Sequence, residues 1–262
     1  MPIRCCLYIL LCLSPLFVAS ANGCELRVRT FSFPPLGIQE QGGTWKGMDM
    51  DFTKALLDKA GCRYSFVDMP WARAMRMLKV GDIDLMLNVS KTVEREKSIH
   101  FVGPQRDEVI RFVSRKGLFG QISHWQQFET LEATLMRQRG TFIGERLSQA
   151  FNTNPRLKSR VVTLADNDVR IELLEKGRAD GFFAESSYLY HQMKHNPAFA
   201  IVEVHPLVIR RAAVYYAFSK ASISKLVMNK INRAYEQIVQ TKQLHDIAKR
   251  YHVEQKNQVL KE

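Results

Sequence analysis

Several polar and charged side chains directly follow segments that have the composition of buried strands. Asn88, Ser90 and Arg95 follow one such segment, and Glu185 follows another. Ligands of parallel α/β sheets bind beyond the carboxyl ends of the strands, so we expect these four side chains to line one cleft. A cation and an anion on opposing walls, together with hydroxyl and amide groups, would suit a zwitterionic solute.

Three further residues are candidates for the same cleft. Phe33 and Trp71 could supply aromatic walls, and Thr141, which follows Gly140, could begin a helix whose backbone N–H groups meet a carboxylate. Each has a plainer alternative, because the aromatic rings could belong to the core and Thr141 could be a simple helix start. From the residues alone, the core is the favoured place for Phe33 and for Trp71, whereas both roles of Thr141 are open.

Arg95 and Glu185 also have structural alternatives. Arg95 lies in the mixed-charge run 94–97, which is typical of a solvated helix face. Glu185 could cap a helix that begins at Ser186, because acidic side chains favour the amino ends of helices.

Catalytic motifs are scarce, and we do not expect an enzyme. The chain has no G-x-S-x-G elbow, no P-loop and no dinucleotide glycine fingerprint. His191 and His195 have i, i+4 spacing, but Gln192 stands where a zinc protease has Glu, which favours a surface pair. We therefore predict neither a metal ion nor a cofactor.

Strand-like and helix-like segments alternate along the chain, which predicts an α/β fold with parallel sheets. The first unit consists of strands near 25–29, 64–67 and 84–87 with helices over 48–60 and 70–79. The second unit consists of strands near 133–136, 161–164 and 181–184, with one helix after Gly140-Thr141 and another over 166–176. Helices over 223–240 and 244–251 complete the chain.

A local repeat supports equivalent elements in the two units. The pattern Leu-x-x-Gly-x-x-Asp occurs over 78–84 and again over 174–180, each time before an apolar strand. In each case a helix is expected to end at the glycine and a short turn to lead into the strand. The physics of helix ends and strand starts explains this likeness without gene duplication.

Two extended stretches, 108–114 and 213–218, lie between and after the two units. Two such crossings predict two lobes joined by a hinge, with a cleft that a ligand can close. We assign residues 22–108 and 213–262 to a discontinuous first lobe, 113–204 to the second lobe, and 109–112 and 205–212 to the hinge.

The first 21 residues have the pattern of a cleaved secretory leader. Arg4 precedes an uncharged apolar run, and 19–21 supplies the small residues that a signal peptidase needs. The alternative is a lipoprotein anchored through Cys24, for which Ala21 is a poor residue three positions earlier. No later stretch approaches the ~20 apolar residues of a membrane helix, so we expect a soluble periplasmic protein.

The composition is that of a globular protein with a basic surface. The 262 residues are 46% hydrophobic and 24% charged, and the formal net charge is +12. Secretion and the scattered placement of Lys and Arg argue against nucleic acid as a partner, whereas an acidic solute is compatible with this charge.

Cysteine usage predicts one disulfide. Three of the five cysteines would leave with the leader, and Cys24 and Cys62 would remain in a compartment that oxidises thiols. Both precede strand-like segments, and neighbouring parallel strands would bring their starts together. Two unpaired buried thiols are the alternative.

With these features the chain resembles the amino-acid-type (family three) periplasmic solute-binding proteins, the group that includes the histidine-binding and lysine/arginine/ornithine-binding proteins. The resemblance runs from about Leu26 to Tyr251 and rests on the order and spacing of several short motifs. These are Phe33-Pro34-Pro35, Trp45-x-Gly47-Met48-Asp49-Met50-Asp51, Pro70-Trp71, Gly81-x-x-Asp84, Thr92-x-Glu94-Arg95 with Phe101-x-x-Pro104, and Gly177-x-x-Asp180 leading to Glu185-Ser186.

The resemblance implies a clamp with the type II periplasmic-binding-protein fold, in which two parallel-core sheets are joined by two extended hinge strands. Such a clamp delivers a solute to an ABC-type permease. Arg95 matches the arginine that grips the ligand α-carboxylate, and Asn88 and Ser90 match the polar residues that bracket the ligand. Phe33 and Trp71 match aromatic walls of the side-chain pocket.

Thr141 matches the helix start in the second lobe that also meets the carboxylate. Glu185 falls where the family usually has Asp for the ligand α-ammonium group. Three departures put a standard amino-acid ligand in question: Glu is one methylene longer than Asp, Asn88 replaces a usual hydroxyl, and Phe142 fills a position that is often polar.

Three functions are compatible with these residues. The first is a transport receptor for an amino acid or a similar small polar solute, and the opposed charges and the lack of a catalytic set favour it. The second is a ligand-sensing module that reports to a membrane partner. The third is a dehydratase-like enzyme in which Glu185 acts as a general acid. We expect a monomer whose partners are the solute and either a permease or a membrane sensor.

Overall fold

The computed structural model describes residues 24–251, so the predicted leader over 1–21 lies outside the described residues. The strands are β1 (Glu25–Thr30), β2 (Ile38–Gln39), β3 (Trp45–Lys46), β4 (Arg63–Asp68), β5 (Leu85–Val89), β6 (Ile99–Arg115), β7 (Leu135–Gln138), β8 (Val161–Leu164), β9 (Gly181–Glu185) and β10 (Val202–Ser219). The helices are α1 (Met48–Lys59), α2 (Trp71–Val80), α3 (Val93–Glu96), α4 (Trp125–Glu129), α5 (Glu145–Thr153), α6 (Pro155–Ser159), α7 (Arg170–Glu175), α8 (Ser186–His195), the 3-10 helix η1 (Pro197–Ile201), α9 (Lys225–Gln240) and α10 (Gln243–Arg250).

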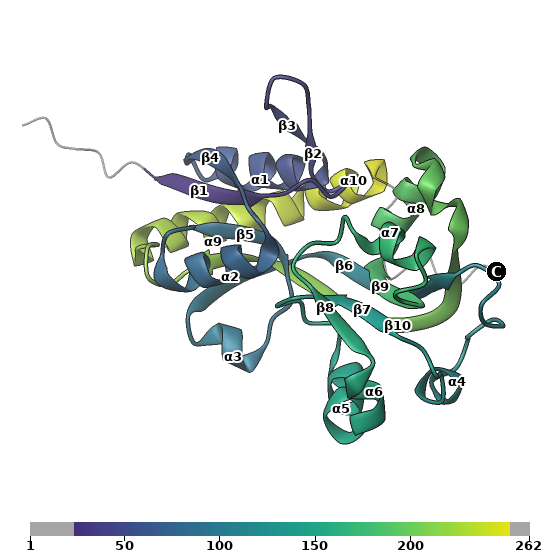
Figure 1. Ribbon diagram of the computed structural model, residues 1–262. Helices are drawn as coiled ribbons and strands as arrows, with labels where there is room; N and C mark the ends of the chain where they lie inside the picture. Colours follow the sequence, from purple (N-terminus) through teal and green to yellow (C-terminus); the bar gives the residue numbers. More distant parts are fainter. Residues whose placement is uncertain (1–23, 252–262) are drawn as a thin grey trace, which may run out of the picture.

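Eight strands form one twisted sheet in the order β4-β1-β5-β10-β6-β9-β7-β8 (Figure 1). At one end β1 pairs in parallel with β4 and β5, and at the other end β7 pairs in parallel with β8 and β9. The antiparallel strands β6 and β10 join these two parallel sets. The predicted α/β class is confirmed, with one difference: the two sheets are hydrogen-bonded into a single sheet through the crossing strands.

The crossing strands β6 and β10 are much longer than the extended stretches that the sequence indicated. They pair from Ser219↔Ile99 to Val202↔Arg115, with register shifts between Val204 and Val208 and again between Val208 and Arg210. The predicted hinge segments 109–112 and 205–212 lie within these strands, and the second includes irregular pairing. A strand twists more and bends at such irregularities, which is compatible with a hinge there.

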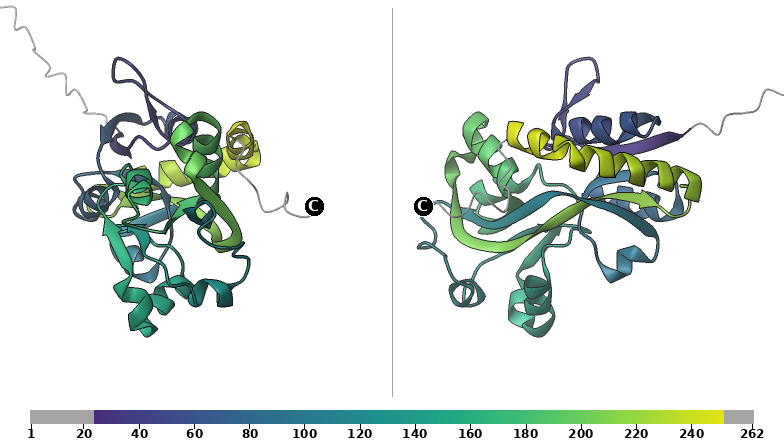
Figure 2. Two further views of the ribbon diagram at one scale, coloured as in Figure 1. Left: turned by 45° about the vertical axis from the view of Figure 1, so that its right-hand side comes forward. Right: turned by 180° about the vertical axis from the view of Figure 1, so that it is seen from behind.

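Helices cover both faces of the sheet in each half of the molecule (Figures 1 and 2). In the half that contains both ends of the described chain, α1, α9 and α10 bury one apolar cluster and α2 buries another. In the other half, α4, α5 and α6 bury a third cluster, and α7 and α8 bury a fourth. Within 24–251 no helix is long and apolar enough to cross a membrane.

Cys24 and Cys62 form the predicted disulfide, with a Cα–Cα distance of 4.6 Å. The reason is the expected one: β1 and β4 are parallel neighbours with Glu25 opposite Arg63, so the residues before the two strands lie side by side. The backbone N–H of Arg63 also donates to the carbonyl of Cys24 at 2.8 Å.

Two helices of the second unit begin later than predicted. The helix expected after Gly140-Thr141 is α5, which starts at Glu145, because Gly140 and Gly144 both have left-handed backbone angles that interrupt a helix. Helix α7 starts at Arg170 rather than near Asp166. The Asp166 carboxylate accepts a hydrogen bond from the backbone N–H of Asp168 at 3.2 Å, which favours a turn over a helix at this point.

The repeated Leu-x-x-Gly-x-x-Asp pattern has one structural role in both halves. The Asp84 carboxylate accepts a hydrogen bond from the backbone N–H of Arg27 in β1 at 2.7 Å, and the Asp180 carboxylate accepts one from the backbone N–H of Thr134, just before β7, at 2.8 Å. Each aspartate therefore ties the start of a central strand to the parallel strand beside it.

Candidate functional site

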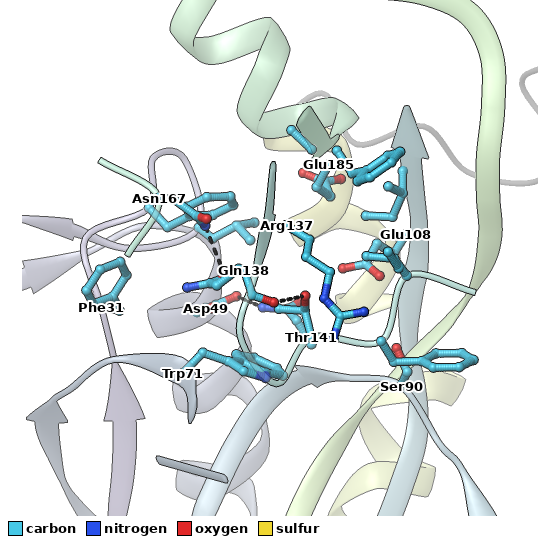
Figure 3. A pocket seen from close by; sticks show the side chains of 18 of the residues that line it. Phe31, Asp49, Trp71, Ser90, Glu108, Arg137, Gln138, Thr141, Asn167 and Glu185 are labelled. Carbon is cyan, nitrogen blue, oxygen red and sulfur yellow. Dashed lines mark hydrogen bonds between the residues drawn. The ribbon is translucent and has the colours of Figure 1, made fainter. Parts of the chain in front are cut away.

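A cavity of about 130 Å³ lies between the two halves of the molecule, at the carboxyl ends of the parallel strands (Figure 3). Its walls come from segments that are far apart in the sequence, including β1, α2, β5, β7 and β9. All seven predicted binding residues line it: Phe33, Trp71, Asn88, Ser90, Arg95, Thr141 and Glu185. The structure thus brings the predicted set together, as the strand-end rule requires.

Arg95 is buried, with 8% of its surface exposed, and is not part of a solvated helix face. The Thr92 side chain caps the short helix α3 and fixes the backbone of Arg95. The guanidinium donates to the Ser90 carbonyl at 2.8 Å and to the Gly140 carbonyl at 3.2 Å. Burial lowers the pKa of Arg95, and nearby Arg210 lowers it further. Among the described residues, none forms an ion pair with it.

Glu185 caps helix α8, as the structural alternative proposed. One carboxylate oxygen accepts hydrogen bonds from the backbone N–H of Tyr188 at 3.0 Å and from the Ser187 hydroxyl. The other accepts from Arg106 Nη1 at 3.3 Å, and both side chains of this ion pair are buried. The carboxylate is therefore held by the protein on two sides, and its role toward a ligand ammonium group stays a prediction.

Asn88 holds two charged residues in place beside the cavity. Its side-chain amide donates to Asp49 at 2.7 Å, and its carbonyl accepts from Arg106 Nε at 3.0 Å. The residue adopts a left-handed backbone conformation with φ of 57°, which Asn tolerates better than most residues. Because its side chain is already bonded at both ends, Asn88 acts here as a positioning residue.

The two predicted aromatic walls serve the core and the cavity together. Phe33 stacks on Tyr188 with ring centroids 4.1 Å apart and also packs against two apolar clusters. Trp71 begins α2, and its indole N–H donates to the Gly140 carbonyl at 3.1 Å. Both rings are half-buried, so neither is a plain core residue.

Thr141 does not begin a helix. It lies in the loop between β7 and α5, and its hydroxyl donates to the Gln138 carbonyl at 2.8 Å. The expected cradle of N–H groups at a helix start is thus not formed by this residue, although its side chain lines the cavity (Figure 3).

Further charged residues of the cavity were missed by the sequence analysis: Arg29, Asp49, Glu108, Arg137 and Arg170. Arg29 and Arg137 lie near the carboxyl ends of β1 and β7, so a consistent use of the strand-end rule would have found them. Asp49 was noted only as part of a motif. Glu108 lies within a crossing strand and Arg170 begins a helix, and the strand-end rule selects neither.

The buried acids of the cavity are influenced by burial and by nearby arginines. Burial raises the pKa of Asp49 and of Glu108, against the opposing effect of Arg106 on both. Glu108 also pairs with Arg210 at 2.7 Å. Burial lowers the pKa of Arg29 to about 10.

The described residues contain no cluster of three or more His, Cys, Asp or Glu side chains that could hold a metal ion. His191 and His195 lie next to each other on α8 with tilted rings whose centroids are 4.4 Å apart, and His195 Nδ1 contacts the His191 carbonyl at 2.9 Å.

Residues 26–254 match the bacterial extracellular solute-binding proteins, family 3. The chain belongs to this family. The match covers nearly all of the chain after the predicted leader and confirms the resemblance that the motifs indicated. A comparison with curated proteins gives no match to this solute-binding protein.

Solved structures confirm the type II fold of this solute-binding protein. An ancestral arginine-binding protein bound to arginine is 22% identical with a TM-score of 0.71, over 87% of this chain and 98% of its own. The substrate binding protein of an amino acid ABC transporter is 20% identical with a TM-score of 0.71, over 88% and 100%. A histidine kinase sensor domain with similarity to periplasmic binding proteins is 14% identical with a TM-score of 0.73, over 88% and 96%.

Proposed function

We propose that this solute-binding protein captures an amino acid or a related small zwitterion between its two lobes and delivers it to an ABC-type permease. Two similar structures are an ancestral arginine-binding protein bound to arginine and the substrate binding protein of an amino acid ABC transporter, which supports this class of ligand. We further propose that the mature chain is a periplasmic monomer released from its leader after Ala21, and that the hinge segments 109–112 and 205–212 allow the lobes to close.

The observation that carries the proposal is the environment of Arg95. Its guanidinium is buried at the cavity, contacts main-chain carbonyl groups of both halves, and forms no ion pair with any residue of 24–251. A buried cation without an anionic partner is costly unless something else supplies the anion. A ligand carboxylate that accepts two hydrogen bonds from the Arg95 guanidinium would supply this anion.

A thermal-shift panel of amino acids, polyamines and organic acids identifies the ligand class. Calorimetry with the compound that raises Tm most then compares the wild type with Arg95→Ala. We expect the variant to bind about 30-fold more weakly or worse, because removing one partner of a buried charge pair costs about 2–5 kcal/mol. The control is Arg63→Ala, since Arg63 lies in an exposed surface pair with Glu25.

Unchanged affinity in a folded Arg95→Ala protein would contradict the proposed carboxylate site. We propose binding without turnover, so the same compound should be recovered unchanged after prolonged incubation. New proton NMR resonances from the compound would instead favour an enzyme on this scaffold.

A further inference from the structure

We propose that the ligand carries a second anionic group, bound by Arg137 and Arg170, which line the cavity from the other half of the molecule than Arg95. This inference rests on the proposed function, in that Arg95 binds one carboxylate of the ligand, and it specifies a solute with two anionic groups: an acidic amino acid, or a dicarboxylate in place of the zwitterion. It depends on which charges of the cavity already have partners within the protein.

The three acids that line the cavity are all engaged by the protein. Glu108 pairs with Arg210 at 2.7 Å, and Glu185 pairs with Arg106 at 3.3 Å. Asp49 accepts a hydrogen bond from the Asn88 side chain at 2.7 Å. None of these carboxylates neutralises Arg95, Arg137 or Arg170 through an ion pair.

Arg170 is the least satisfied of the cavity cations. It is the first residue of α7, only 5% of its surface is exposed, and its Nε and Nη1 atoms are buried without a hydrogen-bond partner among the described residues. Its guanidinium lies over the Phe182 ring at 5.1 Å. Asp166 and Asp168 favour its charged form from a distance, but neither forms an ion pair with it.

Arg137 has the same deficit on the neighbouring element. Its Nε atom is buried and has no hydrogen-bond partner within 24–251. Figure 3 shows the side chain extending from β7 into the cavity beside Thr141. Arginine guanidinium groups are donors only, so these atoms need acceptors, which a ligand that enters the cavity could supply.

The two arginines belong to segments that are tied together. Asn167, just before α7, donates its side-chain amide to the Gln138 side chain at 3.0 Å, and Gln138 follows Arg137 in β7. Three buried donor atoms without partners therefore belong to residues that line the cavity from this half, against one such acceptor, the Asn167 side-chain oxygen. A carboxylate offers two oxygens with about four acceptor positions, which matches this excess of donors.

The positive charge of Arg137 and Arg170 therefore predicts different affinities for ligands that have nearly the same shape but different charge. A neutral amide at this position offers one acceptor and no charge, which leaves buried guanidinium groups uncompensated. An anionic group would neutralise them. The site should consequently bind an acid more tightly than the amide of the same shape. Replacing Arg137 or Arg170 should reduce this preference without unfolding the protein.

Calorimetry on the full mature chain compares L-glutamate with L-glutamine and L-aspartate with L-asparagine, and includes glutarate and succinate. We expect at least one acid to bind about 30-fold or more tightly than its amide twin. Glutarate or succinate binding as well as the amino acids would identify a dicarboxylate ligand, and weaker binding would identify an acidic amino acid. Both results support the second anionic site.

Arg170→Met and Arg137→Met should each reduce the acid-to-amide ratio at least tenfold, whereas Arg170→Lys should retain part of it. The control is Arg139→Met, which removes an exposed arginine close to Arg137 in the sequence. Circular dichroism melting establishes that each variant is folded.

Equal or tighter binding of the amide twins overturns this inference, as does an acid preference that both Met variants keep. Binding of neutral or basic amino acids alone would overturn it while leaving the proposed function intact. Failure of every amino acid and every carboxylate to bind would overturn both.

Discussion

Glu185 has two structural tasks that can be separated by substitution. It caps α8 through the backbone N–H of Tyr188, and it neutralises Arg106, whose side chain is 0% exposed. An amide in place of the carboxylate can still accept the capping hydrogen bond. It cannot neutralise the arginine, which would stay buried without its ion pair.

We therefore expect Glu185→Gln to lower the free energy of unfolding by about 3 kcal/mol, since breaking a buried pair by removing one partner costs about 3–5 kcal/mol. Urea denaturation measures this change. Glu172→Gln is the matched control, because Glu172 lies in an exposed i, i+4 pair with Lys176, and such pairs contribute at most about 0.5 kcal/mol. Equal stability of the two variants would mean that the Arg106 pair contributes little.

The same Glu185→Gln variant tests the predicted contact with a ligand ammonium group. If that contact exists, affinity should fall strongly for L-glutamate and little for glutarate, which lacks the amine. Equal changes for both compounds would leave Glu185 with its structural tasks alone.

Strand order explains which site residues the sequence could predict. Arg95 follows the apolar strand β5 and Glu185 is the last residue of the apolar strand β9, so a rule about strand ends selected both. Arg170 has no such signal, because its burial results from packing over Phe182 in a strand that follows it in the sequence. The use of Asn88 as a support for Asp49 also depends on an approach of two segments that no local pattern indicates.

At the scale of elements, Asp84 connects β1 to the start of β5 through several hydrogen bonds. Its carboxylate accepts from the backbone N–H of Arg27 and from the Arg27 side chain at 2.9 and 3.0 Å. Burial alone would raise the pKa of Asp84, but the hydrogen bonds from Arg27 and Ser222 outweigh it and lower the pKa.

A carboxyl group with a depressed pKa stabilises the fold above its unfolded pKa, and this stabilisation is lost as the pH falls through the folded value. We expect Asp84→Asn to be less stable than the wild type by about 2 kcal/mol at pH 7. The difference should shrink as the pH falls below about 4, where the unfolded carboxyl group titrates. Urea denaturation between about pH 3 and about pH 7 measures this difference in stability.

Asp82→Asn is the matched control, because Asp82 is exposed in the same turn. It should change stability by no more than about 0.5 kcal/mol. A difference between Asp84→Asn and the wild type that stays constant down to pH 3, roughly one unit below the unfolded pKa, would contradict the assigned shift.

The boundaries of a helix were predicted most accurately where the sequence contains residues that clearly mark its ends. Helix α2 was placed within one residue, because Pro70 precedes it and Gly81 takes up the left-handed conformation at its end. The late starts of α5 and α7 arise from a pair of left-handed glycines and from one side chain that bonds its neighbouring backbone. The amino-acid composition of a segment gives little indication of such local conformations, so the sequence did not predict them.

At the scale of the whole molecule, the two halves contact each other around the cavity. Trp71 and Arg95 both donate to the Gly140 carbonyl, and Phe33 stacks on Tyr188. The sequence predicted two lobes but not these contacts, since they depend on how two independently packed halves meet. They favour an arrangement in which the halves are close together, and a ligand that binds between the halves favours the same arrangement.

Trp71→Phe tests this coupling, because it removes the hydrogen bond to Gly140 and keeps an aromatic ring. A hydrogen bond contributes about 0.5–1.5 kcal/mol, so affinity for the tightest compound of the panel should fall about 2- to 12-fold. A lost ligand contact could lower affinity too, so small-angle scattering of the unliganded protein supplies the second readout. If the bond helps to hold the halves together, the unliganded variant should have a larger radius of gyration than the wild type, and saturating ligand should restore the wild-type value.

The control is Trp125→Phe, which alters a ring that lies against Arg146 away from the cavity. It should change neither the affinity nor the radius of gyration. An unliganded Trp71→Phe protein as compact as the wild type would limit Trp71 to a wall of the cavity.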